Sequence, residues 1–431
     1  MSTNSNPEPS GVLPPERFKG TLDNGTRVVP VEFTVSAGVD CRLVFDVDPG
    51  GVEVGRLAFD FRSLPGEILD EISLRGENGK GYRIESDSVT INHHSHGSHG
   101  HKVGFEAAAA TITIPMEQEQ DTALRQWFRS FKSFRNAPIE TPLGTLYVNG
   151  ATKPQDRDEM SGDVTIVAPP GAVTDDWLGR ADAFLLYMHR GIGFMFGGRL
   201  QTPRVDYYRG KIARHTFYAG EAFRSEFPVQ HQLNHDPMLK ALVDRYFDVG
   251  PIPEVIWTAL GWMQSDTTFD ELRFLTAMTA LETLIETELS AKRGTTIAKS
   301  DFAELRTSLE TAVDGSSLSS DEKAIFRQRV SGLNRRSFRE KIDALFHHYR
   351  IPRDDFDAAA IKSLVDLRND IVHRGQISET DKAWPKIILV RELIVRILLS
   401  VIGFEGRYCC YIGGLHDREF KLADLPTEAG D

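Results

Sequence analysis

Hydrophobic and polar residues alternate along much of the first half of the chain, between about residues 20 and 220. The runs are short, rich in β-branched and aromatic residues, and separated by turn sequences such as GENGKG (76–81). A period of two is typical of strands that bury one face. We place strands at residues 28–35, 41–47, 56–61, 82–91, 109–114, 144–148 and 163–167. Strands in series with few intervening helices predict an antiparallel sandwich or a distorted barrel.

Two helices are expected to interrupt these strands. Residues 118–136 carry Leu124, Phe128 and Phe131 at the i, i+4, i+7 spacing of a buried helical stripe. We interpret the aromatic residues of this segment as core, in preference to a base-stacking surface. A second helix is predicted over 175–191, and strands are expected to follow it at 193–198, 204–210 and 211–220.

The hydrophobic period changes to 3.6 after Pro253. Apolar residues form one stripe over 267–289, and two further helical stretches follow at 354–374 and 379–403. The pattern predicts an all-helical bundle of five or six helices over 250–405.

Local signals mark where these helices begin. Ser319–Glu322 and Ser337–Glu340 fit the capping box, in which a serine oxygen and a glutamate carboxylate satisfy free amides at a helix start. We expect a loose link at 290–300, and the sequence RYCCYI after the last helix allows one more strand.

The chain is therefore predicted to be an α+β multidomain protein. Its expected parts are a disordered tail (1–16), a β-rich region of one or two lobes (17–249), the helical bundle (250–405) and a C-terminal extension (406–431).

Composition narrows the functional classes. Hydrophobic residues make up 40% and charged residues 26%, as in ordinary globular proteins. The net charge of −12 argues against a protein that coats nucleic acid along an extended surface, although a local basic site stays open.

The expected location is the cytoplasm. Three cysteines, Cys41, Cys409 and Cys410, favour a reducing compartment over a disulfide framework. The most apolar stretch, 387–402, is interrupted by charged residues before it reaches the length of a membrane span. The N-terminal residues lack the apolar segment of a signal peptide.

One stretch, LRNDIVHRG (367–375), carries candidate chemistry at the end of a predicted helix. Arg368 offers a fixed positive fork for a phosphate. His373 can move a proton near neutral pH, and the helix C-terminus favours its cationic form. Asn369 can position a substrate. These groups suit cleavage of RNA by its own 2′-hydroxyl, a reaction that requires no metal or other cofactor.

The spacing of Arg368 and His373 poses a geometric problem. Five residues correspond to a rotation of about 140° around an ideal helix, so one straight helix points the two side chains apart. Either the last turn relaxes or a second copy of the chain supplies the missing group. Gly375 is expected to take the left-handed conformation that ends the helix.

Arg368 and His373, with Asn369 beside the arginine, resemble the R-x4–6-H motif of HEPN domains. The upstream helix TALETLIE (279–286) and the long apolar final helix fit the same resemblance. It implies a homodimer with a composite cleft, and a metal-independent ribonuclease of the toxin or defence type. A β-rich region followed by a HEPN bundle is similar to ApeA-type anti-phage proteins. That similarity implies RNA, and tRNA among the candidates, as substrate, and a phage-derived trigger.

Several interpretations stay open. Glu282 either holds Arg368 or His373 or simply faces solvent, and Asp370 and Arg374 are further candidate supporting residues. The motif either cleaves RNA or serves a non-catalytic module that binds RNA or protein. A basic run either contacts the RNA backbone or is a solvated helix face; its residues are Arg335, Arg336 and Arg339.

The tract HHSHGSHGH (93–101) invites a metal-binding interpretation. We favour a mobile hairpin loop between two strands, because carboxylate and cysteine partners are missing from the tract. No metal site is therefore predicted.

Overall fold

The computed structural model describes residues 13–37, 43–47, 72–97, 100–134, 136–151, 160–171, 173–220, 227–264, 267–288, 295–375, 377 and 383–424. The chain divides into two compact units, residues 1–249 and 250–431.

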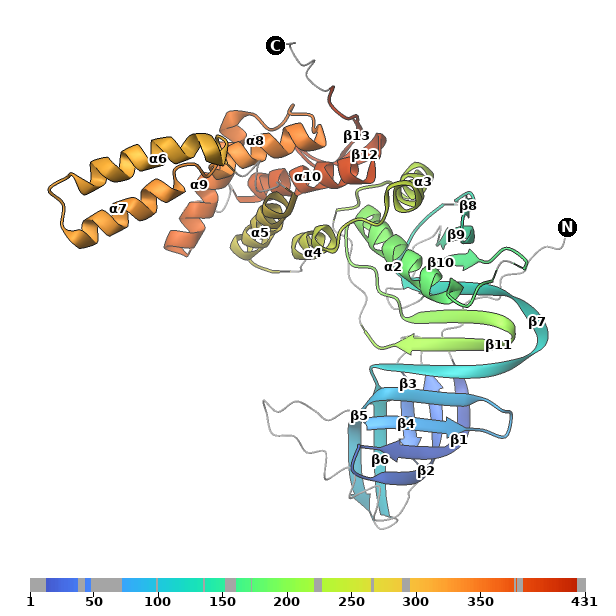
Figure 1. Ribbon diagram of the computed structural model, residues 1–431. Helices are drawn as coiled ribbons and strands as arrows, with labels where there is room; N and C mark the ends of the chain where they lie inside the picture. Colours follow the sequence, from blue (N-terminus) through green and yellow to red (C-terminus); the bar gives the residue numbers. More distant parts are fainter. Residues whose placement is uncertain are drawn as a thin grey trace. The chain divides into compact units, whose positions relative to one another are not determined.

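Six antiparallel strands of the first unit close into a barrel (Figure 1). In β2 every second residue is buried, as the alternating sequence predicts, and Phe33, Phe45 and Phe105 fill the interior. The prediction of a distorted barrel is confirmed. Around the ring the strands are β4 (Ile72–Glu77), β1 (Leu13–Asp23), β2 (Val28–Ala37), β3 (Leu43–Val47), β6 (Gly100–Ala107) and β5 (Arg83–Gly97), which pairs again with β4.

Two glycines allow β1 and β4 to approach closely. Gly20 is paired with Gly76. A Cβ atom on Gly20 would lie 1.8 Å from the carbonyl oxygen of Arg75, which is far inside van der Waals contact. The barrel therefore requires glycine at position 20.

The unit continues in a second group of strands. The long strand β7 pairs with β5 at its start, with β10 along its second half and with β11 along nearly its whole length, so it belongs to both groups. The strands are β7 (Ala109–Arg129), β8 (Ile139–Thr141), β9 (Gly144–Gly150), β10 (Met160–Val167) and β11 (Arg204–Tyr218). The helices are α2 (Trp177–Phe196), α3 (Asp236–Asp244) and the π-helical turn η1 (Arg245–Val249).

The helix predicted over 118–136 is wrong, because β7 runs through Arg129. Leu124 and Phe128 are four residues apart, a spacing that fits both a helix and one face of a strand. Phe131 joins them only because the chain turns at Ser130, whose φ is +58°. Since β7 is flanked by β10 and β11 and buried on both faces near its end, the alternation that marks a strand is missing there.

The predicted helix at 175–191 is confirmed by α2, but α2 extends to Phe196 and replaces the strand expected at 193–198. The two strands expected at 204–220 form one, β11, which folds back on itself. Gly210 has a φ of +57° at the bend, and the amide of Tyr218 donates to the carbonyl of Pro203 at 2.9 Å.

A buried carboxylate holds this fold-back closed. Asp206, fully buried, accepts from the Trp127 indole at 2.7 Å and from Arg204 Nε at 2.6 Å, and its Oδ1 lies 2.6 Å from His215 Nδ1. Burial alone would raise the pKa of Asp206, but the hydrogen bond with His215 and the charge of Arg204 outweigh it and lower the pKa to about 2. Asp206 is therefore an ionised anchor between two halves of one strand.

The structure corrects two other predictions for this unit, and it does not describe the residues of a third. β1 begins at Leu13, so residues 13–16 belong to a strand and not to the expected tail. The backbone of the histidine tract is mostly strand, since β5 and β6 stay paired up to Gly97 and Gly100, in place of the expected loop. The strand predicted at 56–61 lies outside the described residues.

The second unit is built from helices and a short hairpin (Figure 1). The predicted capping boxes at Ser319 and Ser337 are both present. The predicted helical bundle is confirmed, although the described residues form seven helices where five or six were expected, and the strand allowed after it is half of the hairpin. The elements are α4 (Glu254–Met263), α5 (Asp270–Glu288), α6 (Lys299–Asp314), α7 (Ser320–Gly332), α8 (Phe338–Tyr349), α9 (Ala358–Arg374), α10 (Ala383–Ile402), β12 (Gly406–Cys410) and β13 (His416–Phe420).

Helix α10 is the most buried of these helices. Across the described residues we find no helix with the length and apolar character needed to cross a membrane. Residues 290–294 of the expected link lie outside the described residues, and α6 begins within the link at Lys299.

Candidate functional site

The candidate motif occupies the last two turns of α9. The helix begins with Asp357, whose carboxylate accepts from the amide of Ala360 at 2.7 Å. It ends at Gly375, which has the predicted left-handed conformation (φ +73°) and donates to the carbonyl of Ile371 at 2.8 Å. Leu367 and Ile371 are buried, so the polar residues of the motif occupy the outer faces of the helix.

Arg368 is held by a carboxylate from another helix. Its Nε lies 3.2 Å from Oε1 of Glu282 on α5, and both side chains are a little over one third exposed. An ion pair this accessible contributes less than about 1 kcal/mol to folding, so its main effect is to orient the guanidinium. The contact that orients the guanidinium is made through Nε.

His373 and Asn369 are exposed on the same helix. Helix α9 stays α-helical through Arg374, so the last turn does not relax to bring His373 beside Arg368. The ideal rotation of about 140° therefore applies within one chain. His373 lies in the final turn of the helix.

Asp370 and Arg374 pair with each other. Arg374 Nη1 lies 3.5 Å from Asp370 Oδ1, one helical turn away. Of the candidate basic residues, Arg335 and Arg336 lie in the turn between α7 and α8, and Arg339 lies in the first turn of α8. Arg335 and Arg339 are exposed, while Arg336 is half-buried and donates through Nε to the carbonyl of Thr295 at 3.0 Å.

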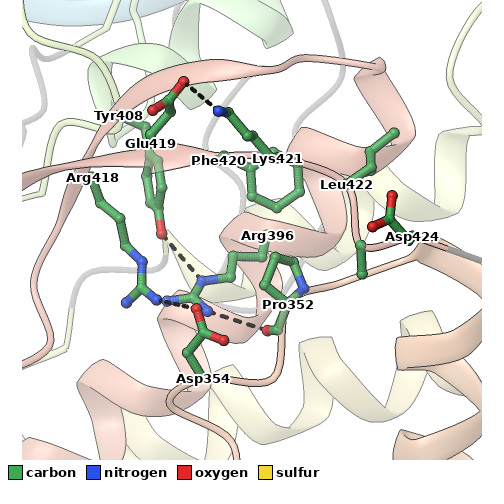
Figure 2. Close-up of a pocket in the computed structure, with 11 residues that line it drawn as sticks. Pro352, Asp354, Arg396, Tyr408, Arg418, Glu419, Phe420, Lys421, Leu422 and Asp424 are labelled. Carbon is green, nitrogen blue, oxygen red and sulfur yellow. Dashed lines mark hydrogen bonds and ion pairs between the residues drawn. The ribbon is translucent and has the colours of Figure 1, made fainter.

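A pocket of about 470 Å³ lies at the other end of α9, which sequence reasoning missed (Figure 2). Its buried Arg396 donates to Asp355 at 2.5 Å, to Glu392 at 3.0 Å and to the Tyr408 hydroxyl at 3.1 Å. Figure 2 shows Arg396, Arg418 and Asp354 together at one end of the pocket.

The charges at this pocket compensate one another. Burial would raise the pKa of Asp355, but hydrogen bonds and charge from Arg396 and Arg418 lower it. Burial, with the nearby Glu392 carboxylate, raises the pKa of Tyr408. The network fastens the segment before α9 to α10 and the β12–β13 hairpin. The signal in the sequence is the pair Glu392 and Arg396, two charged residues four positions apart on an otherwise apolar helix.

Among the residues that the structure describes, no group of three or more histidine, cysteine or acidic side chains could hold a metal ion. The side chains of the histidine tract lie outside this description.

Comparison with known proteins identifies the helical unit. A family model described as Apea-like HEPN matches residues 275–408. No curated protein and no solved structure matches the chain. The matched segment runs from within α5 to β12 and includes both Glu282 and the residues of the α9 motif. The chain therefore carries an Apea-like HEPN domain, preceded in sequence by a β-rich unit.

Proposed function

We propose that this protein is a metal-independent endoribonuclease of the toxin or anti-phage defence type, with its active site at the end of α9. An Apea-like HEPN domain indicates a nuclease or an RNA-binding function. The observation that supports catalysis best is the ion pair between Glu282 and Arg368, which presents an oriented and accessible guanidinium beside the exposed Asn369 and five residues before His373.

The chemistry follows from these groups. The 2′-hydroxyl of a ribose attacks the adjacent phosphorus while a base removes its proton. Arg368 stabilises the extra negative charge on the phosphate oxygens. The bond to the 5′-oxygen breaks, and that oxygen receives a proton. The products are a 2′,3′-cyclic phosphate and a 5′-hydroxyl, so atoms and charge balance without a metal.

His373 supplies the proton transfer, and Asn369 positions the phosphate. Because Arg368 and His373 diverge on one helix, we propose a homodimer in which each chain contributes its motif to a shared cleft. One His373 then acts as base and the other as acid. Proton transfer of this kind typically contributes about 10²- to 10⁴-fold in rate.

The test is cleavage of a labelled single-stranded RNA in EDTA by the purified full-length protein, assayed alone and after addition of an extract of phage-infected cells that can supply the trigger. His373→Ala and Arg368→Ala should each lower the rate at least about 100-fold while the protein stays dimeric in light scattering. Lys362→Ala, which removes an exposed charge paired with Asp366 on the same helix, is the matched control and should cleave normally. Full activity in both motif variants would refute the assignment.

A second candidate function is a non-catalytic module that binds RNA or protein. The regular geometry of α9, which separates Arg368 from His373 in one chain, favours it. This alternative predicts RNA binding without cyclic phosphate products, so mass spectrometry of the RNA ends decides between the two.

We also propose that the β-rich unit senses a phage-derived trigger or restrains the nuclease in the cytoplasm, since an unrestrained ribonuclease would damage its own cell. The RNA of bacteria that express the protein, tRNA included, should stay intact until phage infection. Equal cleavage before and after infection would contradict this role.

A further inference from the structure

We infer that a basic surface between α7 and α8 binds the backbone of single-stranded RNA and leads it to the motif on α9. This inference rests on the proposed function. We call the surface the α7–α8 strip and define it by Phe326, Arg329, Arg335, Arg339 and Lys341.

The strip is positively charged, in contrast to the negative net charge of the chain. Residues 327–341 contain six arginines and lysines against one acidic residue, in a protein whose net charge is −12. The acidic residue, Glu340, is directed to the start of α8, where its carboxylate accepts from the amide of Ser337 at 2.7 Å. Arg327 is paired with Asp314 and is left out of the strip. Positive charge of this density fits a phosphate backbone.

An aromatic ring accompanies the charge. Phe326 is 41% exposed, and the guanidinium of Arg329 lies 5.6 Å from its ring centroid. An exposed ring beside arginines can stack an unpaired base, which a duplex does not offer. We therefore commit to single-stranded RNA and treat an acidic protein as the competing outcome.

The strip is held in place before any ligand arrives. Asn334 exchanges two hydrogen bonds with the backbone of Ile297, at 2.9 and 3.0 Å, and Arg336 donates to the carbonyl of Thr295. These contacts fix the turn between α7 and α8. A surface fixed in advance loses little conformational entropy when it binds.

Helix α5 connects the strip to the motif. Glu282 contacts Arg368, and Glu286 forms an ion pair with Lys341. The two glutamates are four residues apart and lie on the same face of α5, about 6 Å from each other along its axis. Lys341, at the end of the strip, and the guanidinium that we assign to the scissile phosphate therefore contact glutamates that are one helical turn apart on α5.

The test is RNA binding by His373→Ala protein, which should hold the substrate uncut. We would measure fluorescence anisotropy with a labelled 20-nucleotide single strand at several salt concentrations. Adding Arg335→Ala and Arg339→Ala removes two phosphate contacts. Each contact in a single strand contributes about 0.7 to the salt slope, so the slope should fall by about 1.4 and affinity at 0.1 M salt by about 25-fold.

Two further variants sharpen the result. Phe326→Ala should weaken binding of the single strand about fivefold or more and leave duplex binding unchanged. The control Lys240→Ala/Lys362→Ala removes the same charge from exposed ion pairs elsewhere and should bind normally.

The proposal is overturned if the variant lacking Arg335 and Arg339 keeps the salt slope of its parent and binds RNA within twofold of the parent's affinity. It is also overturned if the parent protein binds no RNA. If the strip variant binds RNA normally but no longer binds an acidic protein, the proposal that the strip binds RNA is also overturned. RNA binding that depends on the strip, without any cleavage by the wild type either alone or with the infected-cell extract, would refute the nuclease and support the strip.

Discussion

Asp206 offers the sharpest test of how the N-terminal unit is stabilised. Asp206→Asn keeps the shape of the side chain but removes the charge that faces Arg204 and His215, and it brings an amide donor toward groups that already donate. Removing one partner of a buried, hydrogen-bonded ion pair typically costs about 3–5 kcal/mol. We expect a loss of that size at pH 7.

The pH dependence follows from the lowered pKa. A carboxyl group with a pKa of about 2 in the folded state and 3.8 when unfolded contributes about 2.5 kcal/mol at neutral pH. Because the folded pKa is the lower one, this contribution is complete well above pH 3.8 and disappears as the pH falls through 2. About half of it should remain at pH 3.

The assay is urea unfolding, monitored by hydrogen–deuterium exchange of peptides from β7 and β11. These peptides report on the N-terminal unit separately from the helical one. The difference in unfolding free energy between the wild type and Asp206→Asn should shrink between pH 5 and pH 2. A difference below 1 kcal/mol at pH 7, or one that stays constant down to pH 2, would refute the reasoning.

Three further changes test the HEPN domain. Glu282→Gln should lower RNA cleavage about tenfold, because it releases Arg368, yet change the unfolding free energy by less than about 1 kcal/mol; a normal cleavage rate would refute the positioning role. Gly375→Ala should destabilise the domain by about 1–2 kcal/mol in urea because φ is +73°, whereas Gly375→Asn should be tolerated; equal losses would contradict this account. Asp355→Asn should cost about 1–3 kcal/mol, and because the pKa of Asp355 is lowered, the gap to wild type should narrow as the pH falls through the acid range; a gap independent of pH between 7 and 3 would exclude the ionised carboxylate as the cause.

The sequence predicted those features whose signals are local. The capping serines Ser319 and Ser337 and the terminal Gly375 act on backbone groups within a few residues, so their patterns indicate helix ends directly. The alternation in β2 likewise reports one buried face. The assignment of Arg368, Asn369 and His373 to a site stays a prediction, because it depends on a second chain.

The incorrect and missed predictions have a common physical cause. They depend on contacts between residues that are distant in the sequence. Nothing near Phe128 in the sequence indicates that β10 and β11 flank this part of β7. The four-residue spacing of Leu124 and Phe128 therefore predicts a helix. The partners of Arg396 are spread from Asp355 to Tyr408, and its burial becomes apparent only when α10 meets the segment before α9 and the β12–β13 hairpin.

The continuity of β7 decides whether the N-terminal unit contains one lobe or two. Its early residues complete hydrogen bonding for β5, and its later residues do the same for β10. Removing either part would leave the other with unpaired backbone amides and carbonyls along one edge. Such an edge is a template for aggregation. We therefore expect the barrel and its neighbouring sheet to unfold together in one cooperative transition.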